Sequence, residues 1–232
     1  MNVNDMYQIC QYAINKAQNG YLTPDQFNLL VNQAQTSYQD YLLGEFQQYQ
    51  YGRPQSRVNY SQNSDTRQRM TPFIFETTLS IDGNGHANYP EEYLQTDSLR
   101  TSANDRIRFT QQDSLYSYLK SEIDPIASNP IFLLVDDGFQ FYPKNLGTAT
   151  LSYVMNAPKI VWAYTLDGNN RPVYSPVGVT GAGVYPTTGS VDPLWFDIDK
   201  LEIVARVLKL VGLNLQAGVV EQYANQVTQQ GQ

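Results

Sequence analysis

The residue types that perform most protein chemistry are scarce in this sequence. It contains one histidine, His86, and one cysteine, Cys10, among 232 residues. Serine and cysteine nucleophiles commonly rely on a histidine base, and His86 lies in a Gly-Asn-Gly-His turn, where a structural role is the simpler interpretation. A single cysteine also excludes an internal disulfide and a cysteine-based zinc site. These residues therefore give no indication of nucleophilic or transition-metal catalysis.

Two pairs of adjacent carboxylates are the remaining candidates for acid–base chemistry. They are Glu91-Glu92 and Asp136-Asp137. Neighbouring side chains of an extended strand point to opposite faces, so adjacency alone does not bring such carboxylates together. The segment Gly181-Ala182-Gly183 lacks the third glycine of a dinucleotide-binding loop. We therefore expect no catalytic residue, no cofactor and no metal site, and predict that the protein is not an enzyme.

Residues 15–27 resemble a calcium-binding EF-hand loop, because Gly20 occupies the sixth position. A calcium loop requires oxygen ligands at positions one, three and twelve, with a bidentate carboxylate at the last. This sequence has Asn15, Ala17 and Gln26 there. Alanine offers no ligand, and glutamine cannot bind in bidentate form. The segment is therefore predicted to be a helix–helix turn without calcium.

The composition favours protein contacts over nucleic-acid or membrane binding. Charged residues make up 16% of the chain, compared with about 25% in typical proteins. Glutamine and asparagine together number 41, and tyrosine numbers 18. Amides and phenols suit extensive protein contacts, although a general composition bias explains them equally well. The net charge of −7 argues against a general binder of nucleic acid or anionic lipid. With no run of transmembrane length and no signal-peptide pattern, we expect a soluble protein made in the cytoplasm.

Helical periodicity appears at both ends of the sequence. It predicts a helix over residues 4–19, and a second over 24–51 that opens with the capping box Thr23-Pro24-Asp25-Gln26. The second helix is expected to bury the apolar side chains of its repeat: Phe27, Leu30, Val31, Ala34, Tyr38, Tyr41, Leu42 and Phe46. Residues 199–211 are apolar on two faces, which is more than a surface helix needs, so this helix should be enclosed by its own fold or by neighbouring subunits. Gly212 and Asn214 should end it, and a short helix is expected near 218–229.

Residues 52–71 differ from the helical segments around them. They are polar, lack periodicity, and carry Arg53, Arg57, Arg67 and Arg69 against the single acid Asp65. Alone, such a segment should be mobile. Two interpretations stay open: an arm that becomes ordered against an acidic neighbour, or an ordinary solvated linker.

The middle of the chain has the alternating pattern of antiparallel strands. Strands are expected at 73–81, 131–135, 139–142, 148–155, 159–165 and near Val173, with a helix at 112–121. Residues 175–194 form a loop too long and too neutral to be a casual connection. The sequence thus predicts an α+β fold with N- and C-terminal helices packed together and an antiparallel β region inserted between them. Its parts would be a helical hairpin with an arm at 1–71, the β region with its long loop at 72–190, and C-terminal helices at 191–232 that join 1–71 in one unit.

Several segments, taken together and in order, resemble virion structural proteins of crAss-like tailed bacteriophages. Most of the chain is spanned by the six segments Asn19-Gly-Tyr-Leu-Thr-Pro-Asp-Gln-Phe27, Tyr41-Leu-Leu-Gly-Glu-Phe-Gln-Gln-Tyr-Gln-Tyr-Gly-Arg-Pro54, Arg67-Gln-Arg-Met-Thr-Pro-Phe73, Asp124-Pro-Ile-Ala-Ser-Asn-Pro-Ile131, Glu202-Ile-Val-Ala-Arg-Val-Leu-Lys-Leu-Val-Gly-Leu-Asn-Leu215 and Gln222-Tyr-Ala224. Each is a packing pattern without chemistry, and their joint order carries the resemblance.

The resemblance implies a component of the head-to-tail connector, a ring protein of the neck stacked below the portal. Such a ring would hold about a dozen copies, contact the portal and other neck or tail rings, and let DNA pass through its channel without specific binding. It implies a location at the head–tail junction of the virion and no membrane. The candidate assembly contacts are Arg53, Arg57, Arg67 and Arg69 of the arm, with Leu201 and Leu208 of the C-terminal helix. A tail tube or hub protein of the same virion, a tail-associated hydrolase, and a binding module without a virion role are the alternatives.

The first testable prediction concerns the EF-hand-like turn. Calorimetric titration with millimolar calcium should give no heat beyond dilution, because Ala17 and Gln26 remove two ligands that the ion requires. Saturable binding that disappears on changing Asn15 or Gln26 would contradict the prediction.

Overall fold

The computed structural model describes residues 1–16, 20–46, 57–120 and 125–214, with the backbone alone for 45–46, 57–63 and 213–214. The chain divides into two compact units. One combines Met1–Pro72 with Ala157–Gln232, and the other is Phe73–Asn156. We call the first the helical unit and the second the β unit, and describe each by itself. The fold is α+β with helices at both ends, as the sequence predicts.

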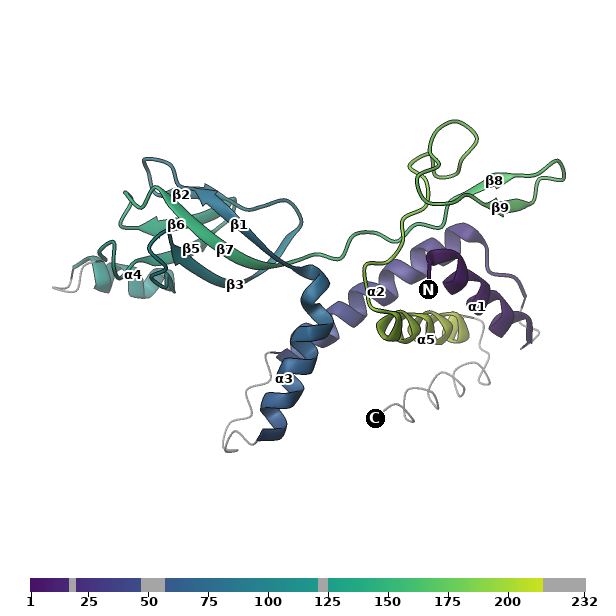
Figure 1. Ribbon diagram of the computed structural model, residues 1–232, viewed down its shortest axis with the longest axis horizontal. Helices are drawn as coiled ribbons and strands as arrows, with labels where there is room; N and C mark the ends of the chain where they lie inside the picture. Colours follow the sequence, from purple (N-terminus) through teal and green to yellow (C-terminus); the bar gives the residue numbers. More distant parts are fainter. Residues whose placement is uncertain (17–19, 47–56, 121–124, 215–232) are drawn as a thin grey trace. The chain divides into compact units, whose positions relative to one another are not determined.

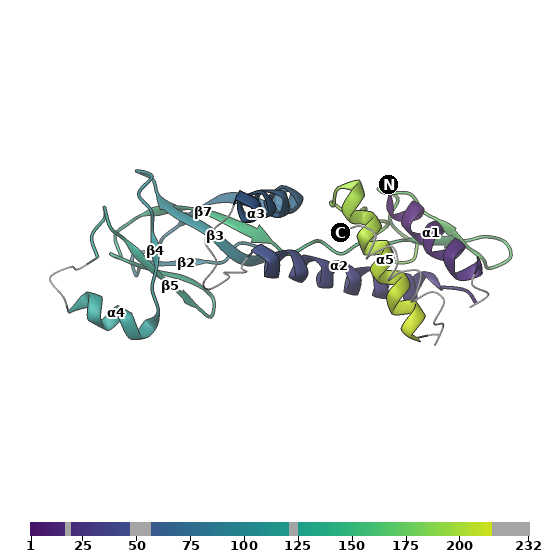
Figure 2. The same cartoon turned by 90° about the horizontal axis from the view of Figure 1, so that it is seen from below.

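Helices form most of the described part of the helical unit (Figure 1). Its elements are α1 (Val3–Lys16), α2 (Pro24–Phe46), α3 (Arg57–Met70), the hairpin of β8 (Tyr164–Leu166) and β9 (Pro172–Tyr174), and α5 (Asp197–Asn214). Helix α5 packs against both α1 and α2, and α3 packs against α2. Figure 2 shows α5 crossing α2. The predicted packing of N- and C-terminal helices is therefore confirmed. The helix expected at 218–229 lies outside the described residues.

Helix α2 begins at the predicted capping box. The Thr23 N–H donates to Gln26 Oε1 at 3.1 Å, and the Gln26 N–H donates to Thr23 Oγ1 at 3.3 Å. Two backbone donors that a helix start leaves without intrahelical acceptors are thereby satisfied. Most of the predicted apolar face of α2 is buried: Phe27, Leu30, Val31, Ala34, Tyr38 and Leu42. The prediction that Tyr41 is buried is wrong, because its side chain is half exposed. The side chain of Phe46 lies outside the described part.

A second face of α2 carries amides that bind an extended stretch of the chain. Asn28 pairs with Trp162 through both backbone groups, accepting from its N–H at 2.7 Å and donating to its carbonyl at 3.1 Å. Asn32 does the same with Ile160, at 2.9 and 2.8 Å. Gln35 donates to the Pro158 carbonyl at 2.9 Å, and the Ala157 N–H donates to Gln39 at 3.1 Å. We call this set of contacts the amide ladder.

The spacing of the amide ladder matches the two backbones. Positions 28, 32, 35 and 39 fall on one helix face. Eleven helical residues rise about 16 Å, and five extended steps from 157 to 162 cover about the same length. Each amide therefore meets its backbone partner without distortion. The α2 side chains do for this segment what a neighbouring strand does in a sheet.

The amide ladder explains why the β unit ends earlier in the chain than the sequence analysis predicts. We expected residues 72–190 to form the β region, with a strand at 159–165. In the structure residues 157–190 belong to the helical unit, and only Tyr164–Leu166 is strand there, as β8. The reason is that Ala157, Pro158, Ile160 and Trp162 bond to side chains of α2, so that this segment forms no regular strand ladder. Single bridges, of Val161 with Val191 and of Tyr164 with Tyr185, join this part of the chain to the long loop.

The segment expected to be a mobile arm is largely helical. Arg57–Met70 forms α3, which packs against α2, and Thr71–Phe73 forms a 3-10 turn. Within α3, Asp65 and Arg69 pair one turn apart at 3.2 Å, and Thr66 and Met70 are buried. These packing contacts supply the order that a polar, aperiodic sequence does not predict. Residues 52–56 lie outside the described part.

The β unit consists of two sheets around one core (Figures 1 and 2). One sheet has the order β1-β7-β3, and the other β2-β6-β5-β4. The elements are β1 (Ile74–Ser80), β2 (His86–Asn88), β3 (Tyr93–Thr101), β4 (Arg108–Phe109), α4 (Gln112–Leu119), β5 (Ile131–Val135), β6 (Gly138–Tyr142) and β7 (Thr148–Met155). All pairings are antiparallel except β4 with β5.

The core of the β unit draws on both sheets. It contains Leu79, Ile81, Ala87, Leu99, Ile107, Phe132, Phe139, Phe141, Ala149, Leu151 and Tyr153. The predicted strands at 73–81, 131–135, 139–142 and 148–155 and the helix near 112–121 are confirmed. Strand β3 was missed because its sequence, Tyr-Leu-Gln-Thr-Asp-Ser-Leu-Arg-Thr, is mostly polar and keeps few side chains in the core.

The amide ladder makes a specific prediction about stability. Asn32→Ala leaves the N–H and C=O of buried Ile160 without partners, which should lower the free energy of unfolding by about 2–4 kcal/mol. Both tryptophans, Trp162 and Trp195, are buried in the helical unit, so their fluorescence in a urea titration reports on that unit.

The matched control is Gln33→Ala. Gln33 is an exposed amide on the same helix, and its loss should change stability by less than about 0.5 kcal/mol. Equal effects of the two substitutions would show that the ladder contributes nothing specific.

Candidate assembly surface

An exposed apolar row leads into helix α5 and continues on its surface. It consists of Leu194, Phe196, Ile198 and Leu201, whose exposed fractions lie between 47% and 74%. The other side of α5 is buried by the chain itself, through Ile203, Val204, Val207, Leu208 and Val211. The prediction that α5 is enclosed therefore holds for one side only. Exposed large apolar side chains that follow one another within a short stretch of sequence indicate a candidate contact surface.

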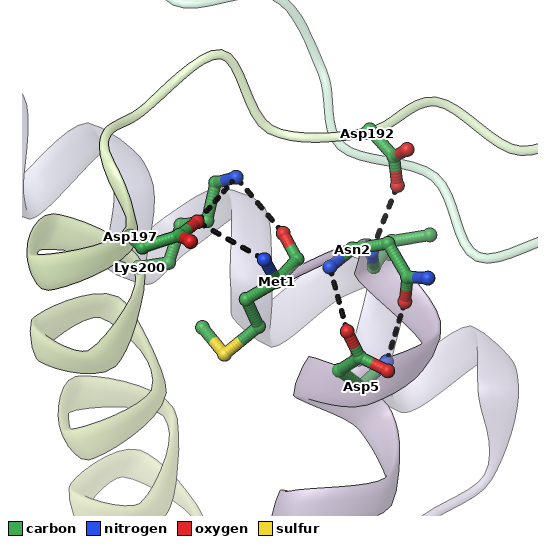
Figure 3. A network of polar contacts seen from close by, with 7 residues as sticks. Met1, Asn2, Asp5, Asp192, Asp197 and Lys200 are labelled. Atoms are coloured by element: carbon green, nitrogen blue, oxygen red, sulfur yellow. Dashed lines mark hydrogen bonds and ion pairs between the residues drawn. The ribbon is translucent and has the colours of Figure 1, made fainter.

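The start of α5 is held in place by polar contacts with the first residues of the chain (Figure 3). The Met1 ammonium lies 3.0 Å from Asp197 Oδ1. Lys200 Nζ donates to the same carboxylate at 3.1 Å and to the Met1 carbonyl at 2.8 Å. Hydrogen bonding from the Met1 ammonium, then from Lys200, holds the pKa of Asp197 below its ordinary value. Nearby, the Val3 N–H donates to Asp192 at 2.8 Å. The exposed row thus begins on a fixed element.

A buried carboxylate two residues further along, that of Asp199, fixes the same helix to α2 and α3. The hydroxyl of Tyr38 donates to Asp199 Oδ1 at 2.7 Å, and Arg69 Nη1 lies 3.5 Å from that oxygen. Burial raises the pKa of Asp199, and the hydrogen bond from Tyr38 and the charge of Arg69 lower it again in part. A buried charge is tolerated when it has such partners. Asp199 therefore joins three helices of the helical unit.

On α5, Glu202 and Arg206 stand one turn apart and form a half-buried ion pair. Arg206 Nε lies 3.1 Å from Glu202 Oε1. The guanidinium also lies 5.3 Å from the ring centres of both Tyr38 and Tyr41. A cation over an aromatic ring is attracted by its quadrupole. The Arg206 guanidinium is therefore engaged by side chains of its own chain.

The predicted assembly residues fall into different environments. Arg53 lies outside the described residues, and only the backbone of Arg57 is described, at the start of α3. Arg67 is exposed. Arg69 binds Asp65 and Asp199 of its own chain. The acidic partners expected on a neighbouring molecule are, for Arg69, residues of the same chain.

The two leucines proposed as contacts are not equivalent. Leu208 is buried, with 5% of its surface exposed, whereas Leu201 is 56% exposed. Leu208 therefore serves the packing of its own chain, and Leu201 belongs to the exposed row. The other members of the row were not predicted as contacts. Leu194 and Phe196 flank the buried Trp195 just before α5, and Ile198 lies between Asp197 and Asp199 in its first turn, so the sequence alone contained no clear signal that these three stay exposed.

The residues singled out for chemistry have structural surroundings. His86 Nε2 lies 2.9 Å from Asp137 Oδ1, across the pairing of β2 with β6. Asp82 accepts the N–H of His86 at 2.7 Å, and this bond lowers the pKa of Asp82. Gly85 has a φ of +81°, and an added Cβ would lie 2.7 Å from the Phe141 carbonyl. The turn thus requires glycine, and His86 with Asp137 closes it.

Cys10 is fully buried in the helical unit. Burial raises the pKa of its thiol to about 12. The thiolate is the reactive form of cysteine, so this thiol stays protonated and inert at neutral pH.

The β unit has a groove of about 640 Å³ along β3, β4 and β5. Among the described residues that line it, Asp97 is the one acid. Within the described part of the chain, no three His, Cys, Asp or Glu side chains are placed to share a metal ion. Over the same residues, each helix is too short or too polar to cross a membrane.

Comparison with known proteins gives no assignment. No protein-family model matches the chain, and no curated protein matches it significantly. A functional proposal is therefore based on the surfaces described above. It is also based on the resemblance that six sequence segments, in their order along the chain, bear to virion proteins.

The network around Asp199 predicts a pH-dependent effect of Arg69→Ala. Because burial raises the pKa of Asp199, the folded protein binds this proton more tightly than the unfolded chain, and stability falls as pH rises through that pKa. Removing Arg69 raises the pKa further. The variant should lose about 1–2 kcal/mol at pH 7, a modest figure because Arg69 is partly solvated, and the loss should shrink as pH falls towards the ordinary carboxyl range.

The control for that experiment is Asp65→Ala. It removes the exposed partner of Arg69 and leaves Asp199 paired. It should therefore lower the free energy of unfolding by less than about 0.5 kcal/mol, both at pH 7 and at acidic pH. Urea titrations followed by tryptophan fluorescence at several pH values measure both variants. A loss for Arg69→Ala that is independent of pH would contradict the role assigned to Asp199.

Proposed function

We propose that the protein is a structural subunit of a tailed-phage virion, a ring or adaptor protein of the head-to-tail connector below the portal. The observation that carries this proposal is the exposed apolar row of Leu194, Phe196, Ile198 and Leu201, which runs into the anchored helix α5. In this proposal, copies associate in a closed ring whose channel passes DNA.

The physical argument begins with the cost of leaving the row in water. Completing the burial of a half-exposed leucine, isoleucine or phenylalanine is worth about 1 kcal/mol per side chain. Four such residues lie within one short stretch of sequence. Because a single contact with a neighbour would bury all four, they share the entropy cost of that contact, and their burial favours association. In a cyclic ring the row of one subunit meets a different surface of the next, and each copy makes the same contact.

The row is also suited to this task because it is pre-formed. Its first part is tied to Met1 through Asp197 and Lys200, and α5 is anchored to α2 and α3 through Asp199. A contact surface that is already ordered loses less entropy when it binds. A ring that must withstand the passage of DNA benefits from the same property.

Two further features support the proposal. The order of six segments resembles virion structural proteins of crAss-like phages, and that resemblance implies a neck ring with about a dozen copies. The net charge of −7 suits a channel through which DNA slides freely, because contacts between basic side chains and phosphates would retain the DNA.

A tail tube or hub protein of the same virion is the second candidate. The exposed row favours it equally, since tail proteins also form closed rings. The two candidates differ in position and copy number per particle, which quantitative mass spectrometry of purified virions measures. A hydrolase would need converging carboxylates, and Asp97 is the one acid among the described residues lining the groove.

The two leucines of α5 separate assembly from folding. Leu201→Asp should leave the tryptophan-monitored stability within about 0.5 kcal/mol, because the side chain is solvent-exposed. Leu208→Ala should lower that stability by about 2–5 kcal/mol, because it opens a cavity in the packing of α5. In a phage whose own gene is silenced, the Leu201→Asp protein should be absent from purified particles, and those particles should lack tails.

The control for assembly is Leu29→Asp. Leu29 is an exposed leucine on α2, outside the row, and its variant should enter virions as the unaltered protein does. Full incorporation of Leu201→Asp would rule out the row as the subunit contact.

A further inference from the structure

A second exposed apolar surface of the helical unit lies on the loop that follows β9. It carries Val177, Val179 and Tyr185, whose side chains are half exposed. From residue 172 to residue 191 the chain has no charged side chain. Exposed apolar side chains in a charge-free stretch indicate a candidate contact surface. We call residues 176–185 the apolar loop.

Backbone contacts hold the apolar loop in one conformation. At its end, Tyr185 and Tyr164 of β8 exchange both backbone hydrogen bonds, at 2.8 and 2.9 Å. Further along, Gly189 passes so close to the loop that an added Cβ would lie 2.5 Å from the Val179 carbonyl oxygen. The exposed valines therefore lie on an ordered backbone. A surface that is ordered before binding loses less entropy when it binds.

The apolar loop and helix α5 lie on different sides of the helical unit. Figure 1 shows the hairpin of β8 and β9, with the loop after it, on one side of α1 and α2, and α5 on the other. Both are tied to these two helices. Helix α5 packs against each of them, and Trp162, just before β8, packs against Tyr7 with ring centres 4.3 Å apart and bonds to Asn28. Two unlike surfaces on different sides of one unit permit a heterologous contact that repeats from copy to copy.

The charges beside the exposed apolar row disfavour a second copy of the same row as its partner. Asp197 precedes Ile198 of the row, and its side chain is 71% exposed. The side chains of its two cationic partners, Met1 and Lys200, are only 12% and 13% exposed. The accessible charge at the border of the row is therefore a carboxylate. A two-fold contact of row with row would bring this carboxylate and its copy to one interface, where like charges repel.

The apolar loop presents the complementary pattern of charge. The charged residue that precedes it most closely in the chain is Arg171, which is exposed. Asp167, on the same hairpin, accepts the backbone N–H groups of Asn169 and Arg171 at 2.8 Å each, so this carboxylate is engaged by its own turn. An uncharged apolar surface with a cation at its border matches an apolar row with a carboxylate at its border.

We infer that the apolar loop of one copy of the chain binds the exposed apolar row of the next copy. The partner of the row is then a second copy of this chain, and the contact is head-to-tail. The inference rests on the proposed function, because it names the second surface of the subunit contact in the proposed ring. Each copy would use its row towards one neighbour and its apolar loop towards the other.

Engineered cysteines test the direction of the contact. Leu201→Cys and Val177→Cys each replace an exposed side chain, and the native Cys10 is fully buried. One variant is labelled with heavy nitrogen, the two are mixed at millimolar concentration with a short bis-maleimide, and mass spectrometry separates mixed dimers from like dimers. Mixed dimers should be at least tenfold more abundant than like dimers. The matched control pairs Leu29→Cys, an exposed leucine outside both surfaces, with Val177→Cys, and should give no such excess.

Two results of the cross-linking experiment overturn the inference. Dimers of Leu201→Cys formed without a second variant would show that row meets row. An absence of excess mixed dimers would show that the apolar loop is not the surface that covers the row.

Incorporation into virions distinguishes failure of this inference from failure of the proposed function. Val177→Asp should be absent from purified particles, as Leu201→Asp should be, and Leu29→Asp should be incorporated. Full incorporation of Val177→Asp together with exclusion of Leu201→Asp would overturn the inference and leave the proposed function in place. Particles that lack the unaltered protein would contradict the proposed function, whereas an excess of mixed dimers would still establish the head-to-tail contact.

Discussion

The amide ladder of α2 is the constraint on which the helical unit depends. Residues 157–162 enter this unit as an extended chain with N–H and C=O groups that need partners, and Asn28, Asn32, Gln35 and Gln39 supply them. Val161 turns its backbone groups to Val191 on the opposite edge, and α2 holds the edge that faces it. Side-chain amides on a helix face satisfy the groups of that edge while α2 still packs its apolar face inward. This lets one helix hold a segment that follows it by more than a hundred residues.

The ladder also governs the position of α5. Gln35 reaches beyond the extended segment and accepts from the indole N–H of Trp195 at 3.1 Å, immediately before the helix. Trp195 packs against Tyr38, with ring centres 5.1 Å apart, and Tyr38 binds Asp199. Gln35 of the amide face and Tyr38 of the apolar face of α2 thus together fix the start of α5, and with it the exposed apolar row. In our proposal, the surface that would join subunits inherits its order from these contacts.

The sequence predicted features whose cause is local and missed those whose cause is tertiary. The capping box at Thr23 and the hairpin around Asp137 follow from short-range chemistry, and both are present. The helical state of 57–70 depends on packing against α2, which composition does not encode. The amides of α2 appeared as a compositional excess, although their spacing on one helix face was a readable signal. For the candidate surface, the double apolar face of α5 was predictable, but which leucine stays exposed depends on what the rest of the chain covers.

Cryo-electron microscopy of the head-to-tail junction of the intact virion tests the central claim most directly. The account predicts a closed ring of this chain at the junction, with the row around Leu201 buried against the adjacent copy and the amide ladder unchanged within each subunit. The copies would surround the DNA channel. Isolated copies on the capsid surface, particles that lack the protein, or a ring in which the row of Leu194, Phe196, Ile198 and Leu201 stays in solvent would contradict it.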